Sequence, residues 1–178
     1  MKYAKEQRAR FWWDLLGCRD SQYGLEKTSW RYRAGEFRYA IRNYVSISPE
    51  LLEFGVTTIV PEDDKVFVYR VSGCGMIYVG QTGDPYKRYC EHLTESVNSI
   101  SPLIEAAIDN NVSPTMTVID VCADSCKLAV EGFWIRWTMP DCLNIAGNET
   151  ETDAFLRDPE CYECAVAKRI VGAMREGK

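Results

Sequence analysis

Five side chains in the middle of this 178-residue sequence carry groups that could act together on a phosphodiester. Phosphodiester hydrolysis needs an activated water, neutralised charge on the phosphate and a stabilised leaving oxygen. A guanidinium can donate two hydrogen bonds to a phosphate, and an imidazole exchanges protons near neutral pH. The candidate groups are the phenols of Tyr69 and Tyr78, the guanidinium of Arg88, the imidazole of His92 and the carboxylate of Glu131.

The two phenols are expected on neighbouring strands of a hairpin. Residues 66–71 alternate with the period of two that is typical of a strand. Residues 72–75 read Ser-Gly-Cys-Gly and favour a turn, because glycine takes positive φ at little cost. Residues 76–80 then form the return strand, so Tyr69 and Tyr78 lie on adjacent strands.

Two helices are expected to supply the other groups. Asp84 is a good N-cap and Pro85 a good first helical residue. Arg88 and His92 are four residues apart, so they share one face of that helix. Glu131 falls in a later helix, near residues 125–138, whose apolar positions cover most of the circumference. A carboxylate there is unusual, because Glu is seldom buried unless it is paired or binds a metal.

The remaining segments complete an α/β pattern. A loop is expected at 145–153, and 46–64 is a connector with a helical turn at 48–52. The other predicted elements are a third strand at 115–121, a candidate edge strand at 56–60, and helices at 4–16, 103–109 and 159–174.

Each candidate also has a structural alternative. Two Tyr side chains on a hairpin commonly pack against their neighbours, and a lone His on a helix is commonly structural. Glu131 could pair with Arg136 or Arg70. The joint occurrence of the groups, in this order, is what favours a site.

The sequence resembles the GIY-YIG nuclease superfamily. The residues that carry the resemblance are Phe67-Val68-Tyr69, Tyr78-Val79-Gly80, Arg88, His92, Glu131 and Asn144. Phe67 stands where the family's first motif has glycine, and the second motif is kept nearly intact. The resemblance covers residues 66–144 and implies a small, mostly antiparallel, three-stranded sheet flanked by helices. We expect a nuclease core at 61–148, an N-terminal helical extension at 1–60 and a C-terminal helix at 149–178 that packs on the core.

The resemblance also implies roles. Glu131 would hold one Mg²⁺ or Mn²⁺, and Arg88 would bind the phosphate. Tyr69 is favoured as the general base, with Tyr78 orienting it, and this order stays open. An ordinary phenol has a pKa near ~10, so Arg88 or the metal would have to lower it. His92 is an alternative base or phosphate donor, and the supporting residues are Gly80, Asn144 and Lys87. Lys87 could replace the cation that some family members carry at the position of Gln81.

Charge distribution points to the N-terminal segment as a DNA contact. The formal net charge is −5, yet residues 1–45 hold ten Lys or Arg against five Asp or Glu. In a surface that mixes the two kinds of side chain, basic groups bind phosphates and aromatic rings stack on bases. The alternative is an amphipathic helix pair whose arginines are solvated. The candidate DNA-binding residues are Arg8, Arg10, Arg31, Arg33, Arg38 and Arg42.

The cysteines allow two interpretations. There is neither a run of about 20 apolar residues nor an apolar leader, so we expect an intracellular, cytoplasmic protein whose eight cysteines are reduced. Cys161-x-x-Cys164 and Cys122-x-x-x-Cys126 have spacings that a structural zinc site could use. Both pairs fall in predicted helices without the usual glycines, so buried free thiols are favoured.

The sequence therefore predicts a divalent-metal-dependent DNA endonuclease of phage, mobile-element or restriction type that acts alone or as a homodimer. Two alternatives come from other classes. One is a catalytically silent DNA-binding or regulatory protein on the same fold, and the other is a zinc-stapled protein–protein adaptor.

Overall fold

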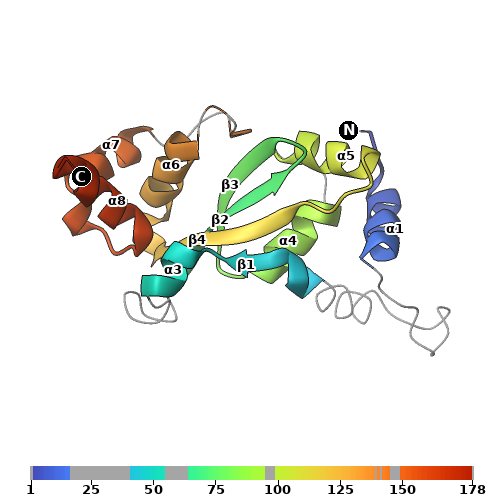
Figure 1. The fold of residues 1–178 in the computed structure, drawn as a ribbon, viewed down its shortest axis with the longest axis horizontal. Helices are drawn as coiled ribbons and strands as arrows, with labels where there is room; N and C mark the ends of the chain where they lie inside the picture. The colour runs from blue at the N-terminus through green and yellow to red at the C-terminus, as the bar shows by residue number, and fades with distance from the viewer. Residues whose placement is uncertain are drawn as a thin grey trace.

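A four-stranded mixed sheet forms the centre of the molecule in the computed structural model, which describes residues 2–16, 41–54, 64–94, 99–138, 140, 142–144 and 149–177. The strand order is β1-β4-β2-β3, with helices on both faces (Figure 1). The expected α/β class is confirmed. No helix in these ranges combines the length and the apolar character that a bilayer span requires.

The predicted hairpin is present and carries the candidate phenols. Strands β2 (Lys65–Gly73) and β3 (Met76–Thr82) pair antiparallel, with Tyr69 opposite Gly80. Cys74 and Gly75 make the turn with φ of 52° and 75°, and successive positive φ angles match the twist of the two strands. On its other edge β2 pairs antiparallel with β4 (Thr115–Ala123), and the register shifts between Val68 and Tyr69.

The expectation of three strands is wrong, because a short fourth strand lies beside β4. Strand β1 (Val45–Ile47) runs parallel to β4, with Val45 opposite Met116. The Ser48 backbone N–H extends the pairing by donating to the Val118 carbonyl over 2.8 Å. Three residues are too few to show a period of two, so the pattern did not reveal the strand. The candidate edge strand at 56–60 lies outside the described residues.

Hydrophobic residues fill both faces of the sheet. On one face lie α3 (Pro49–Phe54), α6 (Lys127–Thr138), α7 (Glu149–Arg157) and α8 (Val166–Arg175). On the other face lie α1 (Lys5–Leu15), α4 (Pro85–Thr94) and α5 (Ser101–Asp109), which pack around Tyr69, Tyr78 and Trp12. In Figure 1 the sheet separates α1 and α5 at one end from α6, α7 and α8 at the other.

The C-terminal region differs from the expectation in two places. The expected loop at 145–153 is wrong for residues 149–153, which form the first half of α7. Its acidic sequence concealed an amphipathic helix that buries Thr152 and Phe155. The expected single helix at 159–174 is also wrong. A 3₁₀ turn (Pro159–Cys161) is followed by an extended segment, and α8 starts only at Val166.

Asp120 explains where α8 begins. Its buried carboxylate accepts hydrogen bonds from the backbone N–H groups of Ala165, Val166 and Ala167 at 2.8–3.1 Å. The Trp134 indole donates to the same carboxylate over 3.0 Å. These N–H groups have no partner inside the helix, so a carboxylate on β4 fixes the start of α8.

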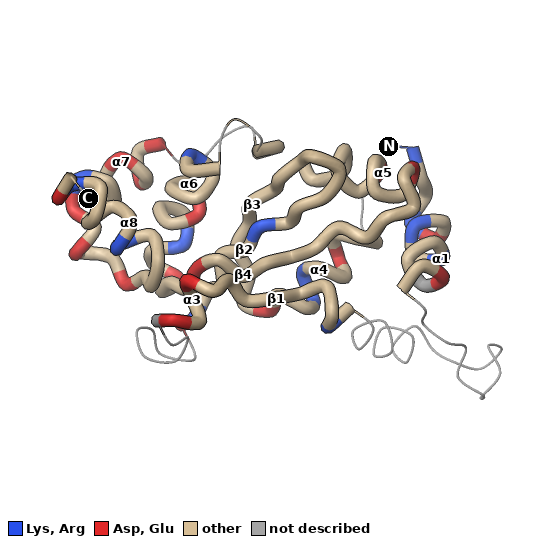
Figure 2. The backbone as a smooth tube through the Cα atoms, in the orientation of Figure 1, with Lys and Arg blue, Asp and Glu red and all other residues tan. Residues whose placement is uncertain are grey.

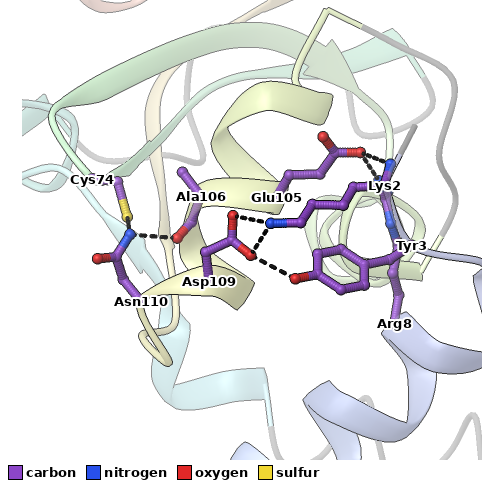
Figure 3. A network of polar contacts seen from close by, with 8 residues as sticks. All are labelled: Lys2, Tyr3, Arg8, Cys74, Glu105, Ala106, Asp109 and Asn110. Atoms are coloured by element: carbon purple, nitrogen blue, oxygen red, sulfur yellow. Dashed lines mark hydrogen bonds and ion pairs between the residues drawn. The ribbon is translucent and has the colours of Figure 1, made fainter.

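The start of the chain is tied to α5. Lys2 Nζ lies 2.8 Å from the Asp109 carboxylate, and the Tyr3 hydroxyl donates to the same group (Figure 3). The Arg8 guanidinium lies 3.1 Å from Glu105. Helix α1 also buries Trp12 in the core beneath the sheet. The N-terminal helix is thus part of the same packed body as the sheet.

Candidate active site

Tyr69 occupies space that Gly80 leaves open. The two residues are opposite each other on β2 and β3. A Cβ added to Gly80 would lie 2.6 Å from Cζ of Tyr69 and closer still to its hydroxyl oxygen. Real Cβ atoms essentially never approach other atoms so closely, so the Tyr69 ring can keep this position only because residue 80 is glycine. This gives Gly80 a defined supporting role.

His92 and the two phenols form a compact cluster of rings. Nε2 of His92 lies 2.7 Å from the Tyr69 hydroxyl. The Tyr78 ring meets the imidazole edge-on at 5.3 Å between centroids, and the two Tyr rings lie 6.4 Å apart. His92 is only 1% exposed. Tyr69 is equally buried, at 0% exposed, so both expected roles of His92 stay predictions.

Burial determines the protonation states in this cluster. Burial, and then the neighbouring Tyr78, raise the pKa of Tyr69 well above its ordinary value, against the lowering effect of Arg88. Burial, with Arg88, lowers the pKa of His92 to about 3. Both groups are therefore neutral at pH 7. Arg88 lowers the pKa of Tyr69 as expected, but desolvation outweighs that effect, and the expected lowering by a metal ion stays a prediction.

A continuous chain of hydrogen bonds runs through the cluster. Arg88 Nε donates to the Tyr69 oxygen over 3.4 Å. The Tyr69 hydroxyl donates to Nε2 of His92 when the imidazole proton is on Nδ1, and accepts from Nε2 when the proton is there. Nδ1 is buried and has no hydrogen-bond partner among the described residues. Arg88, Tyr69 and His92 are thus linked in one hydrogen-bond chain.

Arg88 also contacts a carboxylate that the sequence analysis missed. Its Nη1 donates to Glu91 over 3.0 Å, and the Arg88 side chain remains 34% exposed. Lys87 lies more loosely against the same carboxylate at 3.9 Å and is largely exposed. The signal was in the sequence, because residues three and four apart on a helix are neighbours.

Glu131 reaches this cluster from α6. Burial raises the pKa of its carboxyl, and the Arg88 guanidinium acts in the opposite direction. Its charge in turn raises the pKa of Tyr78, after the larger effect of burial. The Arg136 guanidinium pairs with Asp153 at 2.8 Å, so the expected alternative pair with Glu131 is not formed.

The surroundings of Glu131 suit a hard metal ion. Within the described ranges this half-buried carboxylate makes neither a hydrogen bond nor an ion pair. A carboxylate that is partly desolvated and without a protein partner is costly unless a cation binds it. Mg²⁺ is commonly held by one or two carboxylates, with water and substrate phosphate completing its coordination. Glu131 therefore fits the metal-ligand role that the resemblance implies.

Asn144 braces the strand that carries Tyr78 and Gly80. Its side-chain carbonyl accepts from the Val79 N–H, and its amide donates to the Val79 carbonyl, both at 2.9 Å. The Leu143 N–H also donates to the Ile77 carbonyl over 2.7 Å. Asn144, which was expected as a supporting residue, thus holds this strand through both polar atoms of its side chain.

The candidate DNA-binding arginines fall into three groups. Arg8 is fully buried and pairs with Glu105, so it is not presented to a ligand. Arg10 and Arg42 are exposed. The other three, Arg31, Arg33 and Arg38, lie outside the described residues. In Figure 2 basic residues are visible on α1 and α4, whereas α7 carries a run of acidic ones.

The cysteine pairs do not sit in two helices as expected. Cys122 is in β4, and Cys164 is in the extended segment before α8. Cys161 is exposed and its thiol bonds to Asp158. In the part of the chain that the structure describes, no group of three or more His, Cys, Asp or Glu side chains is arranged to hold a metal.

Comparison with known proteins gives no match to a family model, a curated protein or a solved structure.

Proposed function

We propose that this chain is a divalent-metal-dependent DNA endonuclease. The observation that supports it most strongly is the combination of a continuous Arg88–Tyr69–His92 hydrogen-bond chain with a carboxylate, Glu131, that makes neither a hydrogen bond nor an ion pair among the described residues. Packing alone does not explain why Arg88 and a carboxylate without a hydrogen-bond partner lie near one buried phenol. A phosphodiester would bind the Arg88 guanidinium, and its metal ion would bind the Glu131 carboxylate.

Arg88 is the group that binds the phosphate in this proposal. Its side chain is about one third exposed, and its Nη1 partner is a neighbouring carboxylate, Glu91. A phosphate oxygen is an equivalent acceptor for a guanidinium. We infer that the substrate takes the place of Glu91 on Arg88 while the Nε–H continues to orient Tyr69.

Tyr69 acts as a neutral proton relay. Because its pKa is raised, the phenol keeps its proton at neutral pH. Its oxygen can accept a proton from the attacking water as its own proton passes to Nε2 of His92. A phosphate bound to Arg88 would offset the positive charge that helps to lower the pKa of His92, which makes the imidazole a better acceptor.

Glu131 would hold the metal ion, and Tyr78 would support the relay. Mg²⁺ or Mn²⁺ at Glu131 would neutralise charge on the phosphate and acidify a bound water. Tyr78 packs against both Tyr69 and His92 and limits the rotation of both rings. Exposed cations such as Arg10 and Arg42 would contact the DNA backbone beyond the cleaved bond.

A second candidate is a DNA-binding or regulatory protein without catalysis. The observation that favours it is that neither Tyr69 nor His92 has a pKa near 7, where a general base works best. Incubation of the purified chain with supercoiled plasmid and Mg²⁺ separates the two candidates. The endonuclease proposal predicts nicked or linear product that EDTA prevents. A gel shift without any cleavage would instead support the second candidate. Sequencing the cut ends would then show whether one strand or both are cut, and so whether a dimer acts.

A further inference from the structure

Two buried cysteines face each other across a short antiparallel pairing at the sheet edge. Cys122 of β4 and Cys164 of the extended segment before α8 are bridge partners. The Ala123 N–H donates to the Glu163 carbonyl over 2.9 Å, and the Ala165 N–H donates to the Val121 carbonyl over 3.0 Å. The backbone hydrogen bonds thus flank the cysteine pair on both sides, and the two cysteines exchange none with each other.

This register brings the two side chains close together. An antiparallel ladder contains hydrogen-bonded and non-hydrogen-bonded pairs of opposite residues. The Cα atoms of a non-hydrogen-bonded pair are about 4.5 Å apart, which is the shorter of the two separations. Disulfides join cysteines whose Cα atoms are about 4.4–6.8 Å apart. The two strands therefore already hold Cys122 and Cys164 at a separation that a disulfide can span. Both thiols are free here, at 0% and 2% exposure.

We propose that Cys122 and Cys164 form a reversible cross-strand disulfide when the protein meets a low-molecular-weight disulfide such as oxidised glutathione. One cysteine thiolate attacks the reagent, forms a mixed disulfide and releases one glutathione thiol. The second thiolate attacks the cysteine sulfur of the mixed disulfide and releases the other. Two cysteine thiols thus lose two protons and two electrons, and the reagent is reduced to two thiols.

The rate of this oxidation is controlled by the segment that carries Cys164. Burial raises the pKa of Cys164 to about 12, so very little thiolate exists at pH 7 while the segment is in place. The segment is held by the two flanking backbone bonds and by the Asp120 carboxylate at Ala165 and Val166. Oxidation therefore follows local opening of the segment.

The bond would fix the C-terminal helices to the sheet. Its loop encloses α6, which carries Glu131, and α7, so the cross-link restricts the unfolded chain over about 40 residues. We expect the oxidised protein to melt about 10 °C higher than the reduced protein. This expectation does not depend on the nuclease proposal.

Peptide mapping of the full chain after oxidation tests the proposal. The protein is incubated with oxidised glutathione at pH 8, with and without a low urea concentration that opens local structure, then alkylated and digested without reductant. The expected product joins the peptides of Cys122 and Cys164, forms faster with urea and disappears on reduction. Cys161→Ser, at an exposed position three residues away, should leave this product and the melting shift unchanged, whereas Cys164→Ser should remove both.

Three outcomes would overturn the proposal. One is a dominant Cys122–Cys126 link, because Cys126 is the nearby buried competitor. Another is a link that uses Cys161 in place of Cys122. The third is that Cys122 and Cys164 are recovered fully alkylated even with urea. All three are measured on the unmodified sequence, so they stand even if the Cys164→Ser protein does not fold.

Discussion

Tyr69 and His92 are joined by a 2.7 Å hydrogen bond inside the core, and the raised pKa of one and the lowered pKa of the other keep both neutral. The pair comes from different elements, β2 and α4, and its only charged hydrogen-bond neighbour among the described residues is Arg88. In the proposed endonuclease, this phenol would relay a proton from the attacking water to the buried imidazole. The predictions below follow from this pair and from its surroundings.

Gly80→Ala should reduce stability and activity together. The new Cβ would collide with the Tyr69 ring, which must move or push β3 away. Overpacking of this kind costs about 1–3 kcal/mol, and displaced Tyr69 should lower plasmid cleavage at least tenfold. Gly83→Ala is the matched control, because a Cβ there meets nothing within 4 Å. Equal urea midpoints and equal cleavage rates for the two variants would show that Gly80 does not position Tyr69.

Lowering the pH should destabilise the wild-type chain through His92. A neutral imidazole with a folded pKa of about 3 contributes stability that is complete above its unfolded pKa of ~6.5. That contribution is lost as the pH falls from ~6.5 towards 3, and it amounts to roughly 4 kcal/mol. His92→Gln keeps a polar group near the Tyr69 hydroxyl but does not titrate. The gap in unfolding free energy between wild type and this variant should shrink over that range, and a gap independent of pH would contradict the burial argument.

Asp120→Asn should strongly destabilise the fold without changing any residue of the candidate active site. Asp120 Oδ2 accepts the Trp134 indole N–H and the Ala167 backbone N–H, and an amide NH₂ in the place of Oδ2 cannot accept them. Removing an acceptor from such a buried network costs about 3 kcal/mol or more. Asp124→Asn removes an exposed carboxylate four residues away and should cost under about 1 kcal/mol. Similar losses in the two variants would count against Asp120 as the anchor of α8.

Glu91→Gln should tighten DNA binding. The carboxylate occupies Nη1 of Arg88 and repels an incoming phosphate. Removing its charge should lower the Kd for a short duplex about three- to tenfold at low salt, with a smaller gain at high salt. Glu53→Gln, an exposed position on α3 and on the other face of the sheet, should change the Kd much less. Unchanged affinity in Glu91→Gln would mean that the phosphate does not compete for Arg88.

The sequence predicted the elements whose signals are local. The hairpin followed from alternation over residues 66–71 and from a glycine-containing turn, and α4 followed from Asp84 and Pro85. Glu131 could be singled out because a carboxylate is unusual in an apolar helix, and the Arg88 charge does act on the pKa of its carboxyl. These features depend on short-range chemistry that one chain displays by itself.

Other features depend on contacts between distant segments, which composition and spacing do not report. Strand β1 exists because β4 offers a free edge, and α8 begins where Asp120 supplies acceptors. The polar run at the start of α7 concealed a helix because only a few of its residues are buried. The pKa of Tyr69 rises because the whole fold removes its hydroxyl from water, and no local pattern shows the extent of that desolvation.

The most direct test of the account compares Mg²⁺-dependent cleavage of supercoiled plasmid by wild type and Glu131→Gln, with circular dichroism showing that both are folded. Glu149→Gln on the exposed face of α7 serves as the control for loss of one negative charge. The account predicts that wild type and Glu149→Gln cut the plasmid only with the metal, whereas Glu131→Gln binds the same DNA but cuts at least 10²-fold more slowly. Cleavage by Glu131→Gln at the wild-type rate would contradict it.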